Sequence, residues 1–300
     1  MSSNKKLVVL VGPTGVGKTA MAIRVAEKFK TEIISADSRQ IFKQLNAGTA
    51  KPSEIELRKI QHHFISSHSI ENNYDAGKYG VDALELIKGL FLKYDLIVVS
   101  GGSGLYVKAI CEGFDEMPEV KAQLRDEIKK KYEKKGLLWL QNELKKSDSD
   151  YFEHEDTMNP QRMMRALEIV ISTGKSINAF RQKKKLQHDF QIVKIGLNMD
   201  RKELYERLDT RMDEMINQGL FKEAEDLFNK RHLNALQTVG YNEVFGFLEK
   251  KYSKEEAIRL AKRNTRRYAK RQMTWFGKDK EVEWFKADDF NAITKHINSV

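Results

Sequence analysis

The 300-residue sequence contains one cysteine, Cys111, so no disulfide can form within the chain. A lone cysteine fits a reducing compartment, whereas secreted proteins commonly depend on disulfides. Long apolar runs are also missing, because the polar residues 1–6 are followed by an apolar run only from Leu7 to Val11. Such a run is too short for the core of a signal peptide or for a membrane span. We therefore expect a cytoplasmic protein that makes no use of a membrane.

Charge is abundant, with positive charge in excess. The chain has 53 lysines and arginines against 43 aspartates and glutamates, a net charge of +10. Its 40% hydrophobic and 32% charged residues are an ordinary balance for a globular chain with a sizeable core, in one large domain or two modest ones. The positive charge permits an anionic partner such as nucleic acid, but a merely basic surface gives the same sum. The distribution of the charges along the chain distinguishes these two interpretations.

Three short runs rich in β-branched residues have the character of buried parallel strands. They are Leu7–Val11, Glu32–Ser35 and Leu96–Ser100, and amphipathic helical stretches lie between them at Thr19–Lys28 and Gly80–Phe91. Alternating strands and helices predict a doubly wound α/β sheet, with ligands at the carboxyl ends of the strands.

The pattern changes from about Asp115. Residues 121–146 and 159–172 have helical periodicity, and the next predicted strand begins only at residue 191. We therefore predict an all-helical insertion over residues 113–189, within an α/β domain built from residues 1–112 and 190–300. Three helices are expected in the last part of this domain, at Lys202–Gln218, Phe221–Asn229 and Lys254–Trp275, after a strand at Gln191–Leu197.

The segment GPTGVGKT has the spacing G-x-x-x-x-G-K-[ST] and lies between a predicted strand and a predicted helix, as a phosphate-binding P-loop requires. Its members are Gly12, Pro13, Thr14, Gly15, Val16, Gly17, Lys18 and Thr19. Gly15 and Gly17 let the backbone N–H groups turn toward phosphate oxygens, and the following helix adds the positive end of its dipole. Lys18 neutralises charge, and Thr19 can hold Mg²⁺. Taken alone, the motif suggests an ATP pocket.

One expected carboxylate is missing. A nucleotide-hydrolysing enzyme needs an acid at the end of a neighbouring strand to hold metal and water, but the strand ending at Ser100 continues into Gly101 and Gly102. The acid just beyond a core strand is Asp37 instead. It could order a metal-bound water or act as a base on an acceptor group, and the structural alternative is that it caps a turn.

The C-terminal region carries a long run of positive charge without an acid between Ala257 and Lys278. Its basic residues are Arg259, Lys262, Arg263, Arg266, Arg267, Lys270 and Arg271. On a helix, positions 259, 263, 266 and 270 share one face, and Tyr268, Trp275 and Phe276 supply apolar anchoring. Most charge runs are solvated faces. Because this one has a single sign and interleaved aromatics, it favours a track along a phosphate backbone.

The motifs occur in one order, and together they closely resemble the bacterial tRNA dimethylallyltransferases. The shared segments are GPTGVGKT (12–19), ISADSRQIFKQLNAGTAKP (34–52), SGGSGLY (100–106), PQRMMRALE (160–168), LYERLDTRMDEMINQGL (204–220), VGY (239–241) and TRRYAKRQMTWF (265–276). The P-loop alone is unspecific, but its combination with DSRQ…GTAKP and AKRQMTWF is specific. The resemblance implies a P-loop NTPase-like sheet with a helical insertion. It also implies transfer of a dimethylallyl group from dimethylallyl diphosphate to N6 of the adenosine just 3′ of the tRNA anticodon, with diphosphate leaving.

For the donor, the resemblance implies that Gly12–Thr19 cradle the diphosphate and that Thr19 binds Mg²⁺. Arg211 matches an arginine that grips the diphosphate, with Arg207 as a second candidate. Asp37 matches the general base that takes the proton of the N6 amine.

For the RNA, the resemblance implies contacts in both parts of the chain. They are Asp37, Ser38, Arg39, Gln40 and Ser103 in the α/β part, and Arg125, Gln161, Arg162, Met163, Met164 and Arg165 in the insertion; the basic stretch adds Arg266 and Arg267. Arg125 aligns when counted back from Gly136, and Lys121 fits a different gap. The helical pattern by itself predicts that Met163 and Met164 face a core.

The sequence departs from the family pattern at Ser103, where threonine is usual, and at Phe42, where tyrosine is common. Two other functions remain. A P-loop small-molecule kinase would explain the P-loop and the sheet but not the basic helix. An RNA-binding protein with a vestigial nucleotide site would not need Lys18, Thr19 and Asp37. We expect a monomer that uses Mg²⁺, dimethylallyl diphosphate and the anticodon stem-loop of tRNA.

Overall fold

The computed structural model describes residues 5–182 and 185–300. Its sheet has the strand order β3-β2-β4-β1-β5-β6, and all neighbouring strands are parallel. The bounds are β1 Lys6–Val11, β2 Ile33–Ser35, β3 His62–His63, β4 Leu96–Ser100, β5 Gln191–Asn198 and β6 Glu283–Lys286. The predicted parallel α/β sheet is therefore confirmed. All four predicted strands are present, with ends within one residue of the expected ones.

The central strands are recognisable in the sequence because both of their faces are buried. Leu7, Val8, Val9 and Leu10 of β1 are all fully buried, so no alternation of apolar and polar residues is seen. The sequence did not predict β3 and β6. Both are edge strands whose residues are only partly buried or exposed, and β3 is two histidines long. Pairing with β2 and β5 defines them, rather than a local apolar run.

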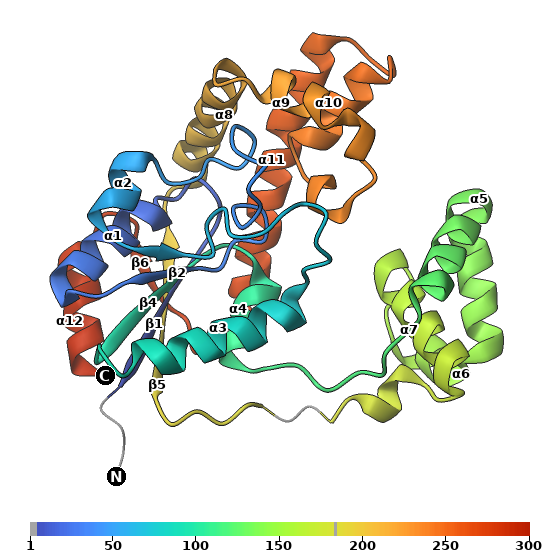
Figure 1. The fold of residues 1–300 in the computed structure, drawn as a ribbon, viewed down its shortest axis with the longest axis horizontal. Helices are drawn as coiled ribbons and strands as arrows, with labels where there is room; N and C mark the ends of the chain where they lie inside the picture. Colours follow the sequence, from blue (N-terminus) through green and yellow to red (C-terminus); the bar gives the residue numbers. More distant parts are fainter. Residues whose placement is uncertain (1–4, 183–184) are drawn as a thin grey trace. The chain divides into compact units, whose positions relative to one another are not determined.

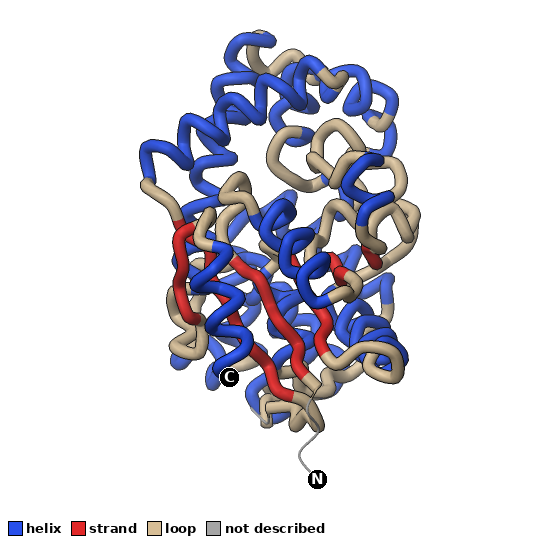
Figure 2. Tube along the Cα trace, turned by 90° about the vertical axis from the view of Figure 1, so that its left-hand side faces the viewer, coloured by secondary structure: helices blue, strands red, loops and turns tan. Residues whose placement is uncertain are grey.

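Helices cover both faces of this sheet (Figures 1 and 2). The bounds are α1 Lys18–Phe29, α2 Glu54–Lys59, α3 Ala76–Leu90, α4 Gly104–Cys111, α8 Arg201–Asn217, α9 Leu220–Asp226, α10 Tyr241–Leu248, α11 Lys254–Phe276 and α12 Phe290–Ser299. Helices α1 and α12 pack together over one face of the sheet, where Val8 and Leu10 of β1 point. Helices α3, α4 and α10 bury their apolar residues with Leu7 and Val9 on the other. The predicted helices are all present, whereas α2, α4, α10 and α12 were not predicted.

Contacts divide the chain into two units, one of Met1–Glu112 and Gln187–Val300 and the other of Gly113–Leu186. The predicted insertion ended at residue 189, three residues beyond this boundary. The second unit is helical in its described part, with α5 Ala122–Ser147, α6 Ser149–His154, α7 Pro160–Thr173 and a 3₁₀ turn at Ile177–Phe180. Helices α5 and α7 pack around a small core of their own that contains Leu140, Leu144 and Met163.

The predicted helix over residues 121–146 is broken in its middle. Gly136 has φ 73° and ψ −170°, outside the helical region. A positive φ is easily reached by glycine, which lacks a Cβ. The two halves of α5 are therefore separate helical segments that meet at this residue. Among the described residues, no helix combines the length and the apolar character needed to cross a bilayer.

Candidate active site

The P-loop joins β1 to α1, and its glycines have the backbone conformations that the motif demands. Gly12, Gly15 and Gly17 have φ values of 142°, 79° and 104°. Gly15 also lacks room for a side chain, because a Cβ there would lie 2.7 Å from Leu208 Cδ2. Gly17 directly precedes α1, so the first N–H groups of the helix open toward the loop. This end of the sheet is built to hold an anion.

Lys18 lies folded over the P-loop. Its Nζ donates hydrogen bonds to the carbonyls of Gly12 at 3.0 Å and Pro13 at 2.8 Å. Loss of water around the ammonium lowers the pKa of Lys18 to about 7; the carboxylate of Asp37 opposes this shift and the guanidinium of Arg211 adds to it. A bound anionic ligand would place negative charge next to this ammonium and stabilise its protonated form.

Arg211, on α8, reaches the P-loop from a distant part of the sequence. Its two terminal nitrogens lie 3.4 Å from Thr14 Oγ1 and 3.4 Å from the carbonyl oxygen of Ala50. Burial lowers the pKa of its guanidinium below the usual value. Arg207, one turn earlier, is exposed and donates weakly to Met199 Sδ at 3.8 Å. Both arginines line the same cavity, but it is Arg211 that contacts the loop.

That cavity, called the phosphate cavity below, has a volume of about 720 Å³. Its wall includes Gly15, Gly17, Lys18, Thr19, Asp37, Gln40, Ala50, Lys51, Glu56, Gly102, Glu206, Arg207, Arg211, Glu214, Tyr268 and Gln272. The structure thus brings together the P-loop, both candidate arginines and Asp37. These residues come from three separate segments of the chain: the P-loop, the turn after β2, and α8.

Asp37 follows β2 and caps the turn behind it. Its Oδ1 accepts the backbone N–H groups of Arg39 at 2.8 Å and Gln40 at 3.2 Å. Asp37 therefore caps this turn, as the structural alternative predicted. Both of these bonds go to Oδ1, and Asp37 also lines the phosphate cavity. Capping and a chemical role are compatible, since they use different atoms of one carboxylate.

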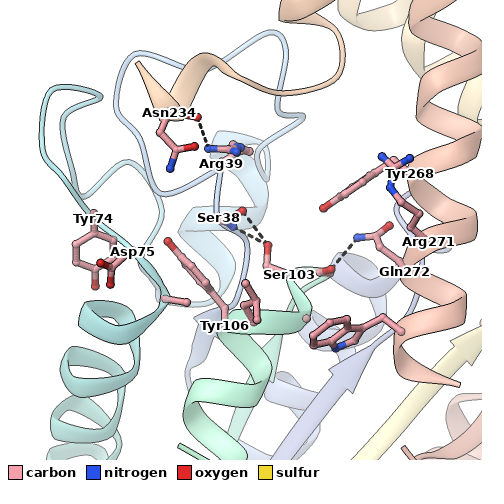
Figure 3. A pocket seen from close by; sticks show the side chains of 15 residues that line it. Ser38, Arg39, Tyr74, Asp75, Ser103, Tyr106, Asn234, Tyr268, Arg271 and Gln272 are labelled. Atoms are coloured by element: carbon pink, nitrogen blue, oxygen red, sulfur yellow. Dashed lines mark hydrogen bonds between the residues drawn. The ribbon is translucent and has the colours of Figure 1, made fainter. Parts of the chain in front are cut away.

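Ser103 forms hydrogen bonds with the turn that Asp37 caps. Its Oγ accepts the N–H of Ser38 at 2.9 Å and donates to Ser38 Oγ at 3.1 Å (Figure 3). These bonds need only the hydroxyl, so a serine serves where threonine is usual. Arg39 donates to the carbonyls of Asn234 at 3.0 Å and Gln237 at 3.4 Å. Three residues expected to contact RNA form hydrogen bonds within the protein in this structure. They are Ser38, Arg39 and Ser103.

A second cavity, called the aromatic cavity, has a volume of about 410 Å³ and lies beside Ser38 and Ser103. Tyr74, Tyr106, Tyr268 and Trp275 line it together with Asp75, Leu105, Asn234 and Arg271, as Figure 3 shows for most of them. Gly102, Tyr268 and Gln272 line both this cavity and the phosphate cavity. The two spaces therefore meet at these three residues. Burial raises the pKa of Tyr268 to about 12, so its phenol stays protonated at neutral pH.

Gln272 is a site residue that sequence reasoning did not single out. It is buried, its Oε1 accepts the N–H of Thr14 at 2.8 Å, and its Nε2 donates to the carbonyl of Gly102 at 2.8 Å. A Cβ at Gly102 would lie 2.2 Å from this amide nitrogen. Gln272 thereby ties the P-loop to the turn after β4. The one sequence feature that could have indicated its role is its position within the shared segment AKRQMTWF.

In the helical unit, α7 presents polar residues on one side and core residues on the other. Gln161 and Arg162 are exposed, and Arg165 is partly exposed, with its guanidinium 3.0 Å from Glu168. Arg125 on α5 lies 3.3 Å from the same carboxylate. Met163 and Met164 are buried, as the helical pattern predicts. Their side chains therefore offer RNA no exposed surface in this structure.

The basic helix α11 divides its cations into two groups. Arg259, Lys262 and Arg266 pair with Glu256, Asp213 and Asp209, at distances of 2.7, 2.7 and 2.5 Å. Two of the four positions on the expected track, 259 and 266, are therefore paired with acids: Glu256 lies on α11 itself, and Asp209 lies on α8. Arg267, Lys270, Arg271 and Lys278 surround a surface hollow of about 360 Å³ beside Trp275. We call these five residues the basic patch.

Comparisons with known proteins show what the whole chain is similar to. The chain matches the family model described as IPP transferase over residues 40–279. It is 48% identical over 296 residues to a tRNA dimethylallyltransferase of Cytophaga hutchinsonii, covering 99% of this chain and 97% of that protein. The structure of the full-length tRNA isopentenylpyrophosphate transferase of Bacillus halodurans aligns with a TM-score of 0.72 at 32% identity, covering 98% of this chain and 97% of that one. That of a eukaryotic dimethylallyltransferase acting on tRNA aligns with a TM-score of 0.77, covering 98% of this chain and 77% of that one; at 24% identity it supports the fold alone.

Proposed function

Because the chain belongs to the IPP transferase family, we propose that it transfers a dimethylallyl group from dimethylallyl diphosphate to N6 of the adenosine that follows the anticodon in tRNA. One observation carries the proposal: the P-loop, Arg211 and Asp37 converge on a phosphate cavity that meets an aromatic cavity at Tyr268 and Gln272. A diphosphate fits the first space, and a planar base fits the second.

In the reaction, the bond between the allylic carbon and the diphosphate oxygen breaks, and a bond from that carbon to N6 forms. The N6 proton passes to the Asp37 carboxylate, and the electron pair of the broken bond leaves with the diphosphate. An allylic carbon tolerates positive charge, so the main barrier is the departure of an anion. Backbone N–H groups of the P-loop, Lys18 and Arg211 stabilise the charge that develops on it. The P-loop thus holds a leaving group.

Thr19, Glu56, Glu206 and Glu214 line the phosphate cavity and carry oxygen ligands of the kind that Mg²⁺ takes. Among the described residues, no three acidic, histidine or cysteine side chains are grouped so that they could hold a metal ion by themselves. Mg²⁺ usually takes one or two protein oxygens and completes its shell with water and substrate phosphates. Thr19 would hold the ion, which when bound supplies further charge stabilisation to the diphosphate.

The adenosine has to leave the stack of the anticodon loop, at a cost of a few kcal/mol. Tyr74 and Tyr268 line the aromatic cavity and offer stacking surfaces that offset this cost. The basic patch and the exposed residues of α7 supply phosphate contacts. We propose that the enzyme works as a monomer in the cytoplasm.

A P-loop small-molecule kinase is less well supported. β4 ends at Ser100 and leads into Gly101 and Gly102, so no acid follows it. The relatives and the family model name a transferase of isoprenoid groups. A kinase with a small-molecule acceptor would also leave the basic patch without a role.

The function is tested by incubating the protein with Mg²⁺, dimethylallyl diphosphate labelled in its alkyl group, and an anticodon stem-loop. A parallel sample receives ATP labelled in its γ-phosphate and candidate small acceptors. We expect label to enter the RNA at one adenosine. Phosphate transfer from ATP without alkylation of the RNA would establish the kinase instead.

Charge reversal in the basic patch is expected to weaken RNA binding. Arg267→Glu should lower the affinity for the stem-loop at least fivefold and make the slope of log K against log[salt] shallower by about one, because one phosphate contact is lost. Arg259→Glu is the matched control. It changes the charge equally on the same helix, but Arg259 is already paired with Glu256. If the two variants lower RNA affinity equally, the basic patch does not contact the RNA.

Donor binding is expected to take up a proton at pH 8. The pKa of Lys18 is about 7 in the free protein, so the amine is mostly neutral at pH 8, and the anionic donor raises this pKa again. Affinity should therefore be highest below pH 7 and fall as the pH rises above it. At pH 8 the phosphates of the donor are already ionised. Calorimetry in buffers of different ionisation enthalpy should show uptake approaching one proton, and none for Lys18→Met. Uptake that persists in this variant would assign the proton to another group.

A further inference from the structure

The segment from Asn46 to Lys51, called the 46–51 loop, forms a wall between two cavities. Ala50 and Lys51 line both the phosphate cavity and a neighbouring cavity of about 540 Å³. Glu223, on α9, lines the neighbouring cavity and not the phosphate cavity. It therefore stands outside the machinery described so far.

One carboxylate accepts three consecutive backbone N–H groups from the first half of this loop. Glu223 Oε2 accepts the backbone N–H groups of Asn46 at 2.9 Å and Ala47 at 3.1 Å, and Oε1 accepts that of Gly48 at 3.3 Å. Hydrogen bonds from backbone N–H groups to an ionised carboxylate are roughly twice as strong as those between neutral partners. Three consecutive donors on one side chain fix the path of the loop.

Tyr241 fixes the carboxylate in turn. It lies on α10, which packs beside α9 (Figure 1), and its hydroxyl donates to Glu223 Oε1. The ring is fully buried, and a Cβ at Gly48 would lie 2.4 Å from it, so the loop is pressed against the ring. Burial and the neighbouring carboxylate raise the pKa of Tyr241, which keeps the hydroxyl a donor.

The other half of the loop faces the P-loop. Ala50 has φ 43°, in the left-handed region that a residue with a Cβ occupies only where its surroundings hold it there. Its carbonyl oxygen accepts Gln40 Nε2 at 3.0 Å and lies 3.4 Å from Arg211 Nη2. The other terminal nitrogen of Arg211 lies 3.4 Å from Thr14 Oγ1. The carbonyl of Ala50 is thus one of two supports that keep the guanidinium over the P-loop.

We propose that Glu223 is a positioning residue for the donor site, which acts through the 46–51 loop and the Ala50 carbonyl to hold Arg211 over the P-loop. This inference rests on the proposed function, in which Arg211 grips the diphosphate. Loss of the carboxylate should free the loop, release the Ala50 carbonyl and let the guanidinium swing away from the P-loop. Glu223 itself touches no substrate.

The test is a double-mutant cycle read by calorimetric titration with inorganic diphosphate and Mg²⁺, without RNA. Glu223→Gln keeps the size of the side chain but replaces one acceptor oxygen by a donor that faces backbone N–H groups. We expect diphosphate affinity to fall about tenfold in Glu223→Gln and no further when the change is added to Arg211→Ala. Stem-loop affinity should stay within twofold. Glu225→Gln, an exposed change on the same helix, should alter neither.

The outcomes separate this inference from the proposed function. If the unaltered protein does not bind diphosphate, both fall. If it binds and Glu223→Gln binds equally well, or if the losses from Glu223 and Arg211 add fully, this inference alone is overturned. Tyr241→Phe removes one hydrogen bond to the Glu223 carboxylate. This variant replaces Glu223→Gln in the experiment if Glu223→Gln does not fold. Its expected threefold loss should likewise vanish in the Arg211→Ala background, and a loss that persists there contradicts the inference.

Discussion

Replacing Asp37 by asparagine is expected to reduce turnover by roughly 10²–10⁴-fold, the usual contribution of a general base. The N6 amine of adenine is a poor nucleophile, because its lone pair is delocalised into the ring. It needs a carboxylate to accept its proton as the bond to carbon forms. Asparagine keeps an oxygen at the Oδ1 position that caps the N–H groups of Arg39 and Gln40. The change therefore removes the base and leaves the turn in place.

The measurement is single-turnover transfer to the stem-loop, together with the affinity for that RNA, which should stay within a few-fold. Asp37→Ala is the companion variant. It should lose turnover to the same extent and also lower the melting temperature, since the cap is gone. If Asp37→Asn keeps near-normal turnover while Asp37→Ala does not, the carboxylate serves the turn and not the chemistry.

Arg211→Gln is expected to lower kcat/KM for the donor by 10²-fold or more, in the range found when one donor to a developing anion is removed. The guanidinium lies 3.4 Å from Thr14 Oγ1 of the P-loop, where the proposed diphosphate would bind. Arg207→Gln is the matched control, because Arg207 lines the same cavity one turn away but is exposed. We expect it to change kcat/KM less than threefold.

The comparison is made at saturating RNA and varying donor. A larger loss from Arg207→Gln than from Arg211→Gln would reverse the assignment of the diphosphate-gripping arginine. Affinity for the stem-loop should be unchanged in both variants. A parallel loss of RNA binding would mean that α8 contacts the RNA directly.

The features that the sequence predicted are those encoded locally. The strand β1 contains the unbroken apolar run Leu7–Val11, and the P-loop that follows it has its chemistry and its glycine conformations in eight consecutive residues. The central sheet and the long helices were predicted for the same reason. The break in α5 depends on a single residue, Gly136, inside an otherwise helical pattern.

The features that the sequence did not predict depend on partners far away in the chain. Gln272 binds the N–H of Thr14 across 258 positions, and no local pattern marks that pairing. The ion pair between Arg266 and Asp209 belongs to the packing of α11 on α8, so the charge run alone could not show which cations are neutralised. Edge strand β6 likewise exists because β5 offers it a neighbour.

The central claim is that the P-loop stabilises a diphosphate as it departs. It is tested most directly by one single-turnover reaction with dimethylallyl diphosphate labelled both in the alkyl group and in the terminal phosphate. The account predicts one intact diphosphate released for each alkyl group that enters the stem-loop, with both yields lost together in Lys18→Met. Release of monophosphate, or terminal phosphate appearing on an acceptor while the RNA stays unalkylated, would contradict it.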